Sequence, residues 1–433
     1  MHNGNSLLRS EKKKKKKGKK KKSTRRTEIE IAAANAELHK KMLTALQRDG
    51  LANFLNDLQP DLPEYVAMQE ALEHYRGLAL LGGWPEVPQD TRLKPDDKDE
   101  RVVFLRKRLA VTEPAYPALG DPEVYDNLLV AGVTRFQQRH GLIADGEVGP
   151  ATLKALNITA TEKVRRIALN LNRLRQLPEV LPNDYIRVNI AEYDLHLVRD
   201  GAEVLNMPVV VGSKKNPTPP MVNKVRHLVF NPYWYPPRTI SAEEILPRLQ
   251  REPEYLENQG FDVLRGREVV DASKIDWHDY NRRTLPYRFR QRPGEKNSLG
   301  RVKFIFPNKE SVYLHDTPAR SLFSQPLRAR SHGCVRVGQP LVLAQALMEW
   351  DRGWSDNEVR EELDKQKRKL RKFKTKMDIY LVYLTARVDE EGVRFPPDIY
   401  GHDRPRTDWL EPAPQVAQIL DPIHSTSDAV ASR

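Results

Sequence analysis

Two neighbouring stretches of this chain decide how it is interpreted: VYLHDTP at residues 312–318 and RSHGCVR at residues 330–336. The first predicts a short strand that ends at His315. The second places Cys334, the only cysteine of the chain, directly after a Ser-His-Gly turn. Because a polar turn of this kind does not suit an apolar core, the sequence indicates a reactive thiol and not a buried, inert one.

The residue types in these stretches fit nucleophilic catalysis by Cys334. A thiol is mostly protonated near neutral pH, and it needs a nearby base or cation to become a nucleophile. His315 is the candidate base because it lies on another strand, whereas His332 is only two residues from the cysteine. Gly333 permits a sharp turn, and its N–H together with that of Cys334 is a candidate oxyanion hole. No second cysteine or metal-binding histidine motif competes with this interpretation, so we expect no metal and no cofactor.

Composition limits the classes of protein that remain. The 433 residues are 39% hydrophobic, which predicts a folded chain of several domains. The net charge is +13, but residues 1–27 hold thirteen Lys and Arg against one Glu and so contribute +12 of it. We therefore expect no nucleic-acid partner. The polybasic tail is interpreted as a solvated, disordered segment or a misassigned start, with binding to anionic polymers or lipid headgroups as the less favoured alternative.

The sequence shows neither a membrane span nor a complete export signal. No stretch approaches the roughly 18 consecutive apolar residues that a spanning helix requires. A secretory signal needs about 7–15 apolar residues after its basic region, and polar residues follow the basic tail instead. A single cysteine excludes an intramolecular disulfide and leaves the compartment open.

Hydrophobic periodicity predicts helices first and a sheet later. Four apolar residues share one helix face in the first part of the chain: Tyr65, Met68, Leu72 and Tyr75. From Tyr185 the period changes to two, and Asp200-Gly201 predicts a hairpin turn between two strands. Short strands at hairpin spacing predict a mostly antiparallel sheet. Asn357–Lys374 is predicted to be a late helix.

The chain is therefore expected to be an α+β multidomain protein. The first half is expected to hold a polybasic tail (residues 1–27), a helical scaffold with a linker (28–100) and a small three-helix domain (101–160). A helical connector (161–184), a β-rich catalytic domain (185–385) and a partly disordered C-terminal extension (386–433) are expected to follow. An insertion rich in Pro, Tyr, Trp and Arg interrupts the catalytic domain at about residues 232–300, with helical and loop pieces that form a lid.

The set His315 and Ser331-His332-Gly333-Cys334 resembles the signature of the L,D-transpeptidases, whose catalytic domain is of the YkuD type. Four further segments resemble the large gram-negative, YcbB-like branch of that family: Asn231–Trp234, Arg290–Gly294, Asn297–Gly300 and Lys303-Phe304. Residues 101–157, with FQQRHGL at 136–142 and DGEVG at 145–149, resemble a type-one peptidoglycan-binding domain. The resemblance extends over roughly residues 50–400.

This resemblance implies an acyl transfer on a peptidoglycan tetrapeptide stem. Cys334 is implied as the nucleophile that attacks the carbonyl of the third residue, with release of the terminal D-Ala. An amine of a neighbouring stem then takes the acyl group and forms a 3→3 cross-link. His315 is implied as the general base, oriented by the backbone carbonyl of Asp316, while His332 and Gly333 shape the pocket.

The resemblance also implies residues that contact substrate: Tyr313, Ser331, Arg336 and Trp234. Many members of the family have Asn two residues after the cysteine, where this chain has Arg336. The YcbB-like branch carries Arg there, so this departure concerns the details of the substrate and not activity. For the aromatic group Tyr233–Tyr235, core packing is the main expectation, with one or two members lining the cleft.

Several alternatives remain open at the level of sequence. The acyl acceptor is a stem amine, water (a carboxypeptidase) or a protein lysine (attachment to the wall), and all three share the acyl-enzyme. A wall-binding scaffold without activity is opposed by the complete motif. Residues 101–160 either bind glycan or brace the catalytic domain. Expected partners are peptidoglycan stem peptides, with other cell-wall synthesis enzymes left open, and such a substrate places the protein in the periplasm or cell envelope.

Overall fold

The structure is a computed structural model, and it describes residues 36–48, 50–88, 92–114, 117–118 and 120–404. The predicted polybasic tail and most of the predicted C-terminal extension lie outside these residues. The chain divides into two compact units after Pro397. The described part of the second unit is a turn in which the Asp398 carboxylate accepts hydrogen bonds from the N–H groups of His402 and Asp403, at 2.8 and 2.9 Å.

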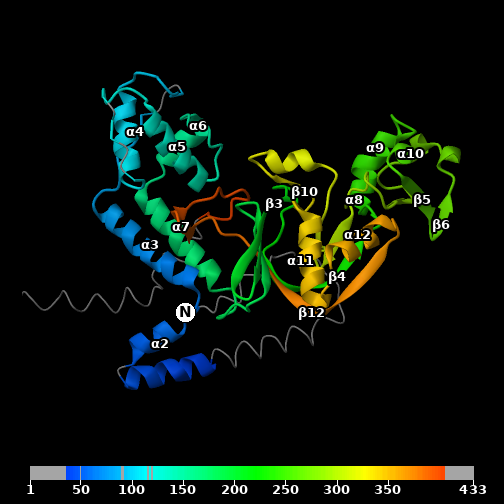
Figure 1. The fold of residues 1–433 in the computed structure, drawn as a ribbon, viewed down its shortest axis with the longest axis horizontal. Helices are drawn as coiled ribbons and strands as arrows, with labels where there is room; N and C mark the ends of the chain where they lie inside the picture. Colours follow the sequence, from blue (N-terminus) through cyan, green and yellow to red (C-terminus); the bar gives the residue numbers. More distant parts are fainter. Residues whose placement is uncertain (1–35, 49, 89–91, 115–116, 119, 405–433) are drawn as a thin grey trace, which may run out of the picture. The chain divides into compact units, whose positions relative to one another are not determined.

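A helical scaffold precedes the sheet in the first unit. Residues 36–47 are helical, and α2 (Leu51–Asp57) and α3 (Pro63–Leu80) follow (Figure 1). α3 begins at a proline, which suits the first helical turn because no N–H is needed there. The four apolar residues predicted to share a face of this helix are all buried. They pack with α7 (Ala160–Leu174) in one core, so the predicted face is confirmed.

Three helices form the next group: α4 (Arg101–Ala110), α5 (Asn127–Arg139) and α6 (Pro150–Leu156). They enclose a core of their own. α5 begins where it does because the Asp126 carboxylate accepts a hydrogen bond from the Leu129 N–H at 3.0 Å and so caps the helix. The expected small three-helix domain is present.

A buried polar joint attaches this three-helix group to α7. His140, which caps α5, has its Nδ1 2.7 Å from the Phe136 carbonyl oxygen, and its Nε2 lies 2.9 Å from Lys163 Nζ of α7. The Lys163 ammonium also lies 3.6 Å above the ring centroid of Phe395. Burial, followed by neighbouring arginines, lowers the pKa of Lys163 well below its usual value. Because a buried polar group is costly without a hydrogen-bond partner, the contact with His140 favours the packing of α7 against this three-helix group.

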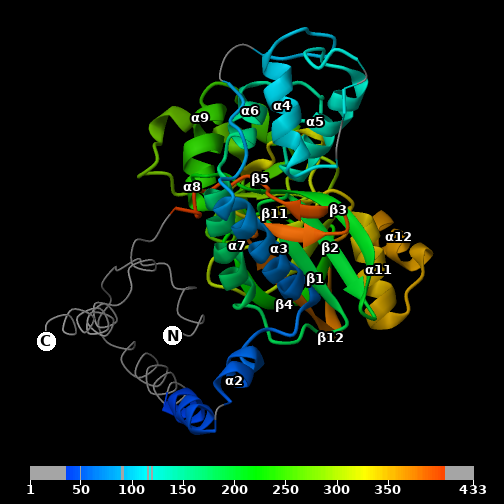
Figure 2. The same cartoon turned by 90° about the vertical axis from the view of Figure 1, so that its left-hand side faces the viewer.

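Nine strands form the main sheet, in the order β10-β3-β11-β9-β8-β4-β12-β1-β2. Their bounds are β1 (Tyr185–Asn189), β2 (Asp194–Arg199), β3 (Ala202–Gly212), β4 (Met221–Phe230), β8 (Val302–Ile305), β9 (Leu314–His315), β10 (Ala329–Ser331), β11 (Val335–Val337) and β12 (Lys369–Val382). β2 pairs with β3 as well as with β1, so the sheet closes on itself (Figure 2). The pairings β1–β12, β3–β10 and β9–β11 are parallel and the other six are antiparallel. The expected α+β fold with a mostly antiparallel sheet is confirmed.

The predicted turn at Asp200-Gly201 joins β2 to β3. Both residues have positive φ angles, 52° and 79°. This is the backbone of a two-residue hairpin turn whose twist matches that of the strands, and Gly adopts it without strain. The turn therefore sets the register in which Val198 faces Glu203, and a shift by one residue beyond it brings Leu197 opposite Leu205.

One predicted helix is wrong over half of its length. The structure has α11 (Pro340–Arg352) and α12 (Asp356–Asp364), but the helix predicted over Asn357–Lys374 ends at Asp364. Gln366 turns the chain with a φ of 46°, and β12 begins at Lys369. Residues 369–374, the first part of β12, are too lysine-rich to read as a core strand, and they pair with β4, which lies far away in the sequence. Distant strand pairing therefore overrides the local pattern.

The insertion between β4 and β8 is a small unit with its own apolar core. It contains the helical segments α8 (Arg238–Ile240), η2 (Ser241–Ile245), α9 (Leu246–Leu249), α10 (Tyr255–Asn258), η3 (Ala272–Lys274) and η4 (Trp277–Asp279). It also contains a three-stranded antiparallel sheet that the sequence did not predict: β5 (Phe261–Arg265), β6 (Glu268–Val270) and β7 (Arg288–Gln291). An isolated antiparallel β-bridge pairs Trp234, near the start of the insertion, with Gln291, near its end.

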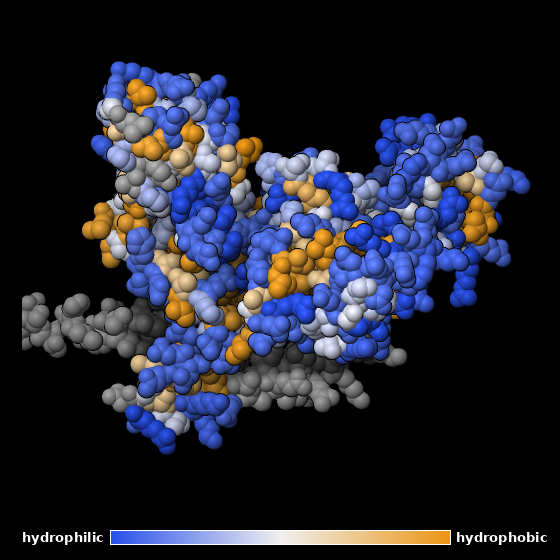
Figure 3. Space-filling view, in the orientation of Figure 1, coloured by the Kyte–Doolittle hydropathy of each residue, from blue (hydrophilic) through white to orange (hydrophobic). Residues whose placement is uncertain are grey.

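The surface seen in Figure 3 is largely hydrophilic, with separate apolar patches. The most exposed large apolar side chains of the described residues are Leu80 and Leu81, which follow one another at the end of α3. In the part of the chain that the structure describes, no helix has the length and the apolar character needed to cross a membrane.

Candidate active site

Cys334 lies in the turn between β10 and β11. Gly333, just before it, has a φ of 110°, a backbone conformation that favours glycine. The Gly333 N–H donates a hydrogen bond to Ser331 Oγ at 3.1 Å. The hydroxyl of Thr218 donates to the Gly333 carbonyl oxygen at 2.8 Å and accepts from the Gly212 N–H at 2.8 Å. The side chain of Ser331 within the turn and that of Thr218 from another segment therefore hold the turn that presents the thiol.

The thiol itself is partly buried against Tyr313. The Cys334 sulfur lies 3.7 Å from the Ser311 carbonyl oxygen, and the next residue, Val335, donates its N–H to the Tyr313 carbonyl at 3.0 Å. Burial raises the pKa of Cys334, although hydrogen bonds from Tyr313 and the charges of Lys303 and Arg336 oppose this shift. The resting protein therefore holds a protonated thiol, and it needs a base before attack.

His315 is the candidate base for this thiol, because it ends β9, which lies beside β11. Its Nδ1 lies 2.5 Å from the backbone carbonyl oxygen of Asp316. A carbonyl oxygen only accepts, so the proton is assigned to Nδ1 and Nε2 is left unprotonated. Burial, followed by the charge of Arg336, lowers the pKa of His315 to about 3. The imidazole is thus neutral, with a free lone pair.

Asp316 is held on both sides. Its carboxylate accepts the N–H of Arg301 at 2.7 Å and that of Thr317 at 2.6 Å, and it pairs with Arg320 at 2.5 Å. Gly300 lies so close that an added Cβ would be 2.2 Å from this carboxylate. These contacts fix the Asp316 backbone, and with it the carbonyl that faces the imidazole.

The strand register places two cations beside His315. Lys303 of β8 and Arg336 of β11 are each directly opposite His315 in the sheet. Lys303 Nζ also lies 3.5 Å from the ring centroid of Tyr313. From the sequence, Lys303 stood out only as part of a family resemblance. Its alternating position in a predicted strand was the only sequence pattern that could have pointed to Lys303 as a site residue. That pattern does not place Lys303 opposite His315, because this placement depends on the pairing of distant strands.

Two of the predicted site residues lie toward the insertion instead. His332 Nε2 is 2.8 Å from Glu244 Oε1 of η2, and both side chains are about half exposed. Trp234 packs its ring against Phe261, at 6.0 Å between centroids, as part of the insertion's core. The structure thus brings together Cys334, His315, Asp316, Gly333, Ser331, Tyr313 and Arg336, while the contacts of His332 and Trp234 are with the insertion.

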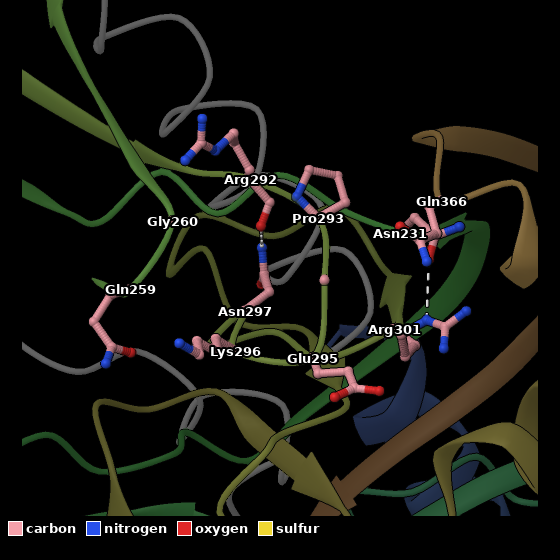
Figure 4. Close-up of a pocket in the computed structure, with 11 residues that line it drawn as sticks. Asn231, Gln259, Gly260, Arg292, Pro293, Glu295, Lys296, Asn297, Arg301 and Gln366 are labelled. Atoms are coloured by element: carbon pink, nitrogen blue, oxygen red, sulfur yellow. Dashed lines mark hydrogen bonds between the residues drawn. The ribbon is translucent and has the colours of Figure 1, made fainter. Parts of the chain in front are cut away.

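A separate cavity of about 400 Å³ lies at the base of the insertion (Figure 4). Its lining includes Arg292, Lys296 and Arg301 and does not include the thiol or the imidazole. Asn297 donates to the Arg292 carbonyl oxygen at 2.9 Å, and Arg301 donates to Asn231 Oδ1 at 3.2 Å. Its walls are therefore joined by hydrogen bonds within the loop and to the end of β4. No group of His, Cys, Asp and Glu side chains in the described residues is arranged to hold a metal ion.

Comparison with known protein families agrees with this geometry. Residues 183–356 match the family model described as the L,D-transpeptidase catalytic domain. Residues 98–156 match the model described as "Putative peptidoglycan binding domain". Residues 183–356 are therefore similar to an L,D-transpeptidase catalytic domain, and residues 98–156, which precede them, are similar to a peptidoglycan-binding domain.

One curated relative and several solved structures were compared with this chain individually. A "Putative L,D-transpeptidase" of Haemophilus influenzae is 36% identical over 254 residues, which are 58% of this chain and 50% of the relative. The chain thus spans about half the length of the curated relative that it matches. Among solved structures, an L,D-transpeptidase from Stackebrandtia nassauensis is 15% identical, with 69% of this chain and 96% of that chain covered and a TM-score of 0.24. One from Xylanimonas cellulosilytica is 16% identical, with 68% and 98% covered and a TM-score of 0.21.

Proposed function

We propose that this protein is a peptidoglycan L,D-transpeptidase that works through a thioester on Cys334. The observation that carries the proposal is the pairing of a held thiol with a neutral imidazole on the neighbouring strand, whose Nδ1 is occupied by the Asp316 carbonyl. The catalytic-domain family supports a transpeptidase role, and the peptidoglycan-binding-type domain supports peptidoglycan as the substrate.

In the proposed first half-reaction, the Cys334 thiol gives its proton to His315 Nε2, and the sulfur attacks the carbonyl carbon of the third residue of a tetrapeptide stem. The C–N bond to the terminal D-Ala then breaks, and the imidazolium returns the proton to the leaving amine. The Cys334 N–H is the proposed donor to the oxyanion, since the Gly333 N–H already donates to Ser331.

In the proposed second half-reaction, a side-chain amine of a neighbouring stem attacks the thioester. His315 takes the proton that this amine loses, a new amide bond forms and the thiol is restored. The product is a 3→3 cross-link. Tyr313 and Arg336 line the donor site in this proposal, and His332 and the insertion border the approach to the sulfur. Such a substrate places the protein in the periplasm or envelope.

The test uses a carbapenem, whose strained lactam acylates catalytic thiols. Intact-protein mass spectrometry of the full chain should show an adduct of the mass of the opened carbapenem, and Cys334→Ala should show none. His315→Asn should slow the formation of the adduct, because the base is removed while a polar side chain of similar reach is kept. If the folded wild-type protein forms no adduct, the proposal of a catalytic thiol fails.

Natural substrates then identify the acceptor. Purified tetrapeptide stems are incubated with the protein, and the products are sequenced by mass spectrometry. Cross-linked dimers support transpeptidation, whereas tripeptides alone would show that water is the acceptor and would overturn the cross-linking part of the proposal.

A further inference from the structure

Two cations stand beside the thiol without an acidic partner. Lys303 and Arg336 are both partly buried, and neither forms an ion pair with an Asp or Glu of the described residues. The Nε of Arg336 is shielded from solvent and has no hydrogen-bond partner in this part of the chain. Arg139 is paired with Glu113 and Arg387 with Glu192, whereas Arg108 and Arg328 donate to backbone carbonyl oxygens. The site therefore holds positive charge that the protein does not neutralise.

The strand register gives these two cations a common orientation. Lys303, His315 and Arg336 lie directly opposite one another on the adjacent strands β8, β9 and β11. Residues that are directly opposite across neighbouring strands point to the same face of a sheet. The two cations therefore flank the imidazole on one face. The Lys303 side chain extends from there over the Tyr313 ring, toward the cysteine.

Such an arrangement is costly in the free protein. Burial lowers the pKa of both Lys303 and Arg336, which means that the charged forms are disfavoured where they lie. The thiol offers them no compensation at rest, because its own pKa is raised and it is protonated near neutral pH. An unpaired buried cation is stabilised when an anion binds beside it.

We propose that Lys303 and Arg336 together bind a carboxylate of the substrate, next to the carbonyl that Cys334 attacks. This inference rests on the proposed function, and it adds Lys303 as a specificity-determining residue. A tetrapeptide stem offers two carboxylates near the scissile bond: the terminal carboxylate of the leaving D-Ala and the side-chain carboxylate of a diamino acid in third position. The planar guanidinium of Arg336 presents two parallel donors to such a group, and Lys303 adds a point charge.

A pair of small alkylating reagents tests the charge preference without any peptidoglycan. Iodoacetate and iodoacetamide both react with the thiolate, which displaces iodide as the C–S bond forms. They differ only in carrying a carboxylate or a carboxamide. Because both use the same thiolate, the ratio of their rate constants is independent of the pKa of Cys334. We expect the rate constant for iodoacetate, divided by that for iodoacetamide, to fall at least about fivefold in Lys303→Gln. In Lys303→Arg this ratio should stay within about twofold of the wild-type value.

Arg368→Gln is the matched control. Arg368 is exposed and close enough to influence Lys303, so this variant removes the same charge near the site but outside it. A change of less than about twofold in Arg368→Gln supports a local carboxylate site. If Lys303→Gln and Arg368→Gln lower the ratio equally, long-range attraction accounts for it and the proposal is overturned. Circular dichroism confirms that each variant is folded. Neither reagent resembles a stem peptide, so this result is independent of whether transpeptidation occurs.

Stem peptides then identify which carboxylate is bound. Donors with an amidated C-terminus or an amidated third-residue side chain are compared with the unmodified donor, for the wild-type protein and for Lys303→Gln. We expect one amidation to raise KM about tenfold in the wild-type protein and to have little further effect in Lys303→Gln, because both changes remove the same interaction. That analogue identifies the carboxylate. If each amidation changes KM equally in the wild-type protein and in Lys303→Gln, Lys303 does not bind either carboxylate. The proposed carboxylate site is then wrong, even where the acyl-enzyme forms normally.

Discussion

Replacing Thr218 by valine tests how firmly the Cys334 turn must be held. Thr218 is fully buried, and its hydroxyl joins the Gly212 N–H to the Gly333 carbonyl through two hydrogen bonds of 2.8 Å. Valine has nearly the same shape but neither donates nor accepts, so both backbone groups lose this partner inside the protein. Each loss costs about 1–3 kcal/mol, and we expect the free energy of unfolding to fall by about 2–5 kcal/mol.

Urea denaturation followed by circular dichroism measures this loss, and Thr218→Ser is the control. Serine keeps the hydroxyl, so its free energy of unfolding should fall by less than about 1.5 kcal/mol. The Thr218→Val variant should also form the carbapenem adduct more slowly at a temperature where it is folded, because the turn before the thiol is less fixed. If Thr218→Val is as stable as Thr218→Ser, the hydroxyl does not hold the turn and the reasoning is refuted.

Three further predictions concern pH and backbone strain. Burial lowers the pKa of His196, but hydrogen bonds to Asp194 and Glu203 outweigh burial and raise it. The stabilising effect of His196 is therefore complete below the ordinary histidine pKa and is lost as pH rises through the raised pKa. His196→Gln should lower the urea midpoint more at about pH 5 than at about pH 9. Burial raises the pKa of Cys334, and the hydroxyl of Tyr313, which hydrogen-bonds the sulfur, opposes this rise; Tyr313→Phe should therefore move the inflection of the iodoacetamide rate to higher pH, and an unmoved inflection would contradict this. Gly300→Ala puts a Cβ against the Asp316 carboxylate at a φ of 58° and should cost about 1–3 kcal/mol of stability, whereas Gly77→Ala, which meets nothing within 4 Å, should not destabilise the protein in the same denaturation assay.

The parts of the fold that sequence predicts well are those decided by nearby residues. The buried face of α3 follows from apolar residues at helical spacing, and the β2–β3 hairpin follows from an Asp-Gly pair whose backbone conformation few other residues adopt. The turn before Cys334 belongs to the same group, since Gly333 and Ser331 make their contact within the turn.

The parts that sequence does not predict are set by distant partners. Residues 369–374 look helical on their own, but β4 pairs with them and makes them a strand. Lys303 belongs beside His315 only because β8 and β9 pair in one particular register, and Thr218 reaches the cysteine turn from another segment altogether. No local pattern contains this information, because a shift of one residue would move Lys303 to the opposite face.

The position of β12 sets where this protein can be divided. This strand comes from residues 369–382, after the segment that matches the catalytic-domain family, yet it lies in the middle of the sheet between β4 and β1. A fragment cut to residues 183–356 would keep the thiol and the imidazole but would open the sheet and expose two unpaired strand edges, which invite aggregation. The last residues of the same strand also enter the core of the helical scaffold. The segment that matches the family model is therefore shorter than the segment that must fold together in this chain.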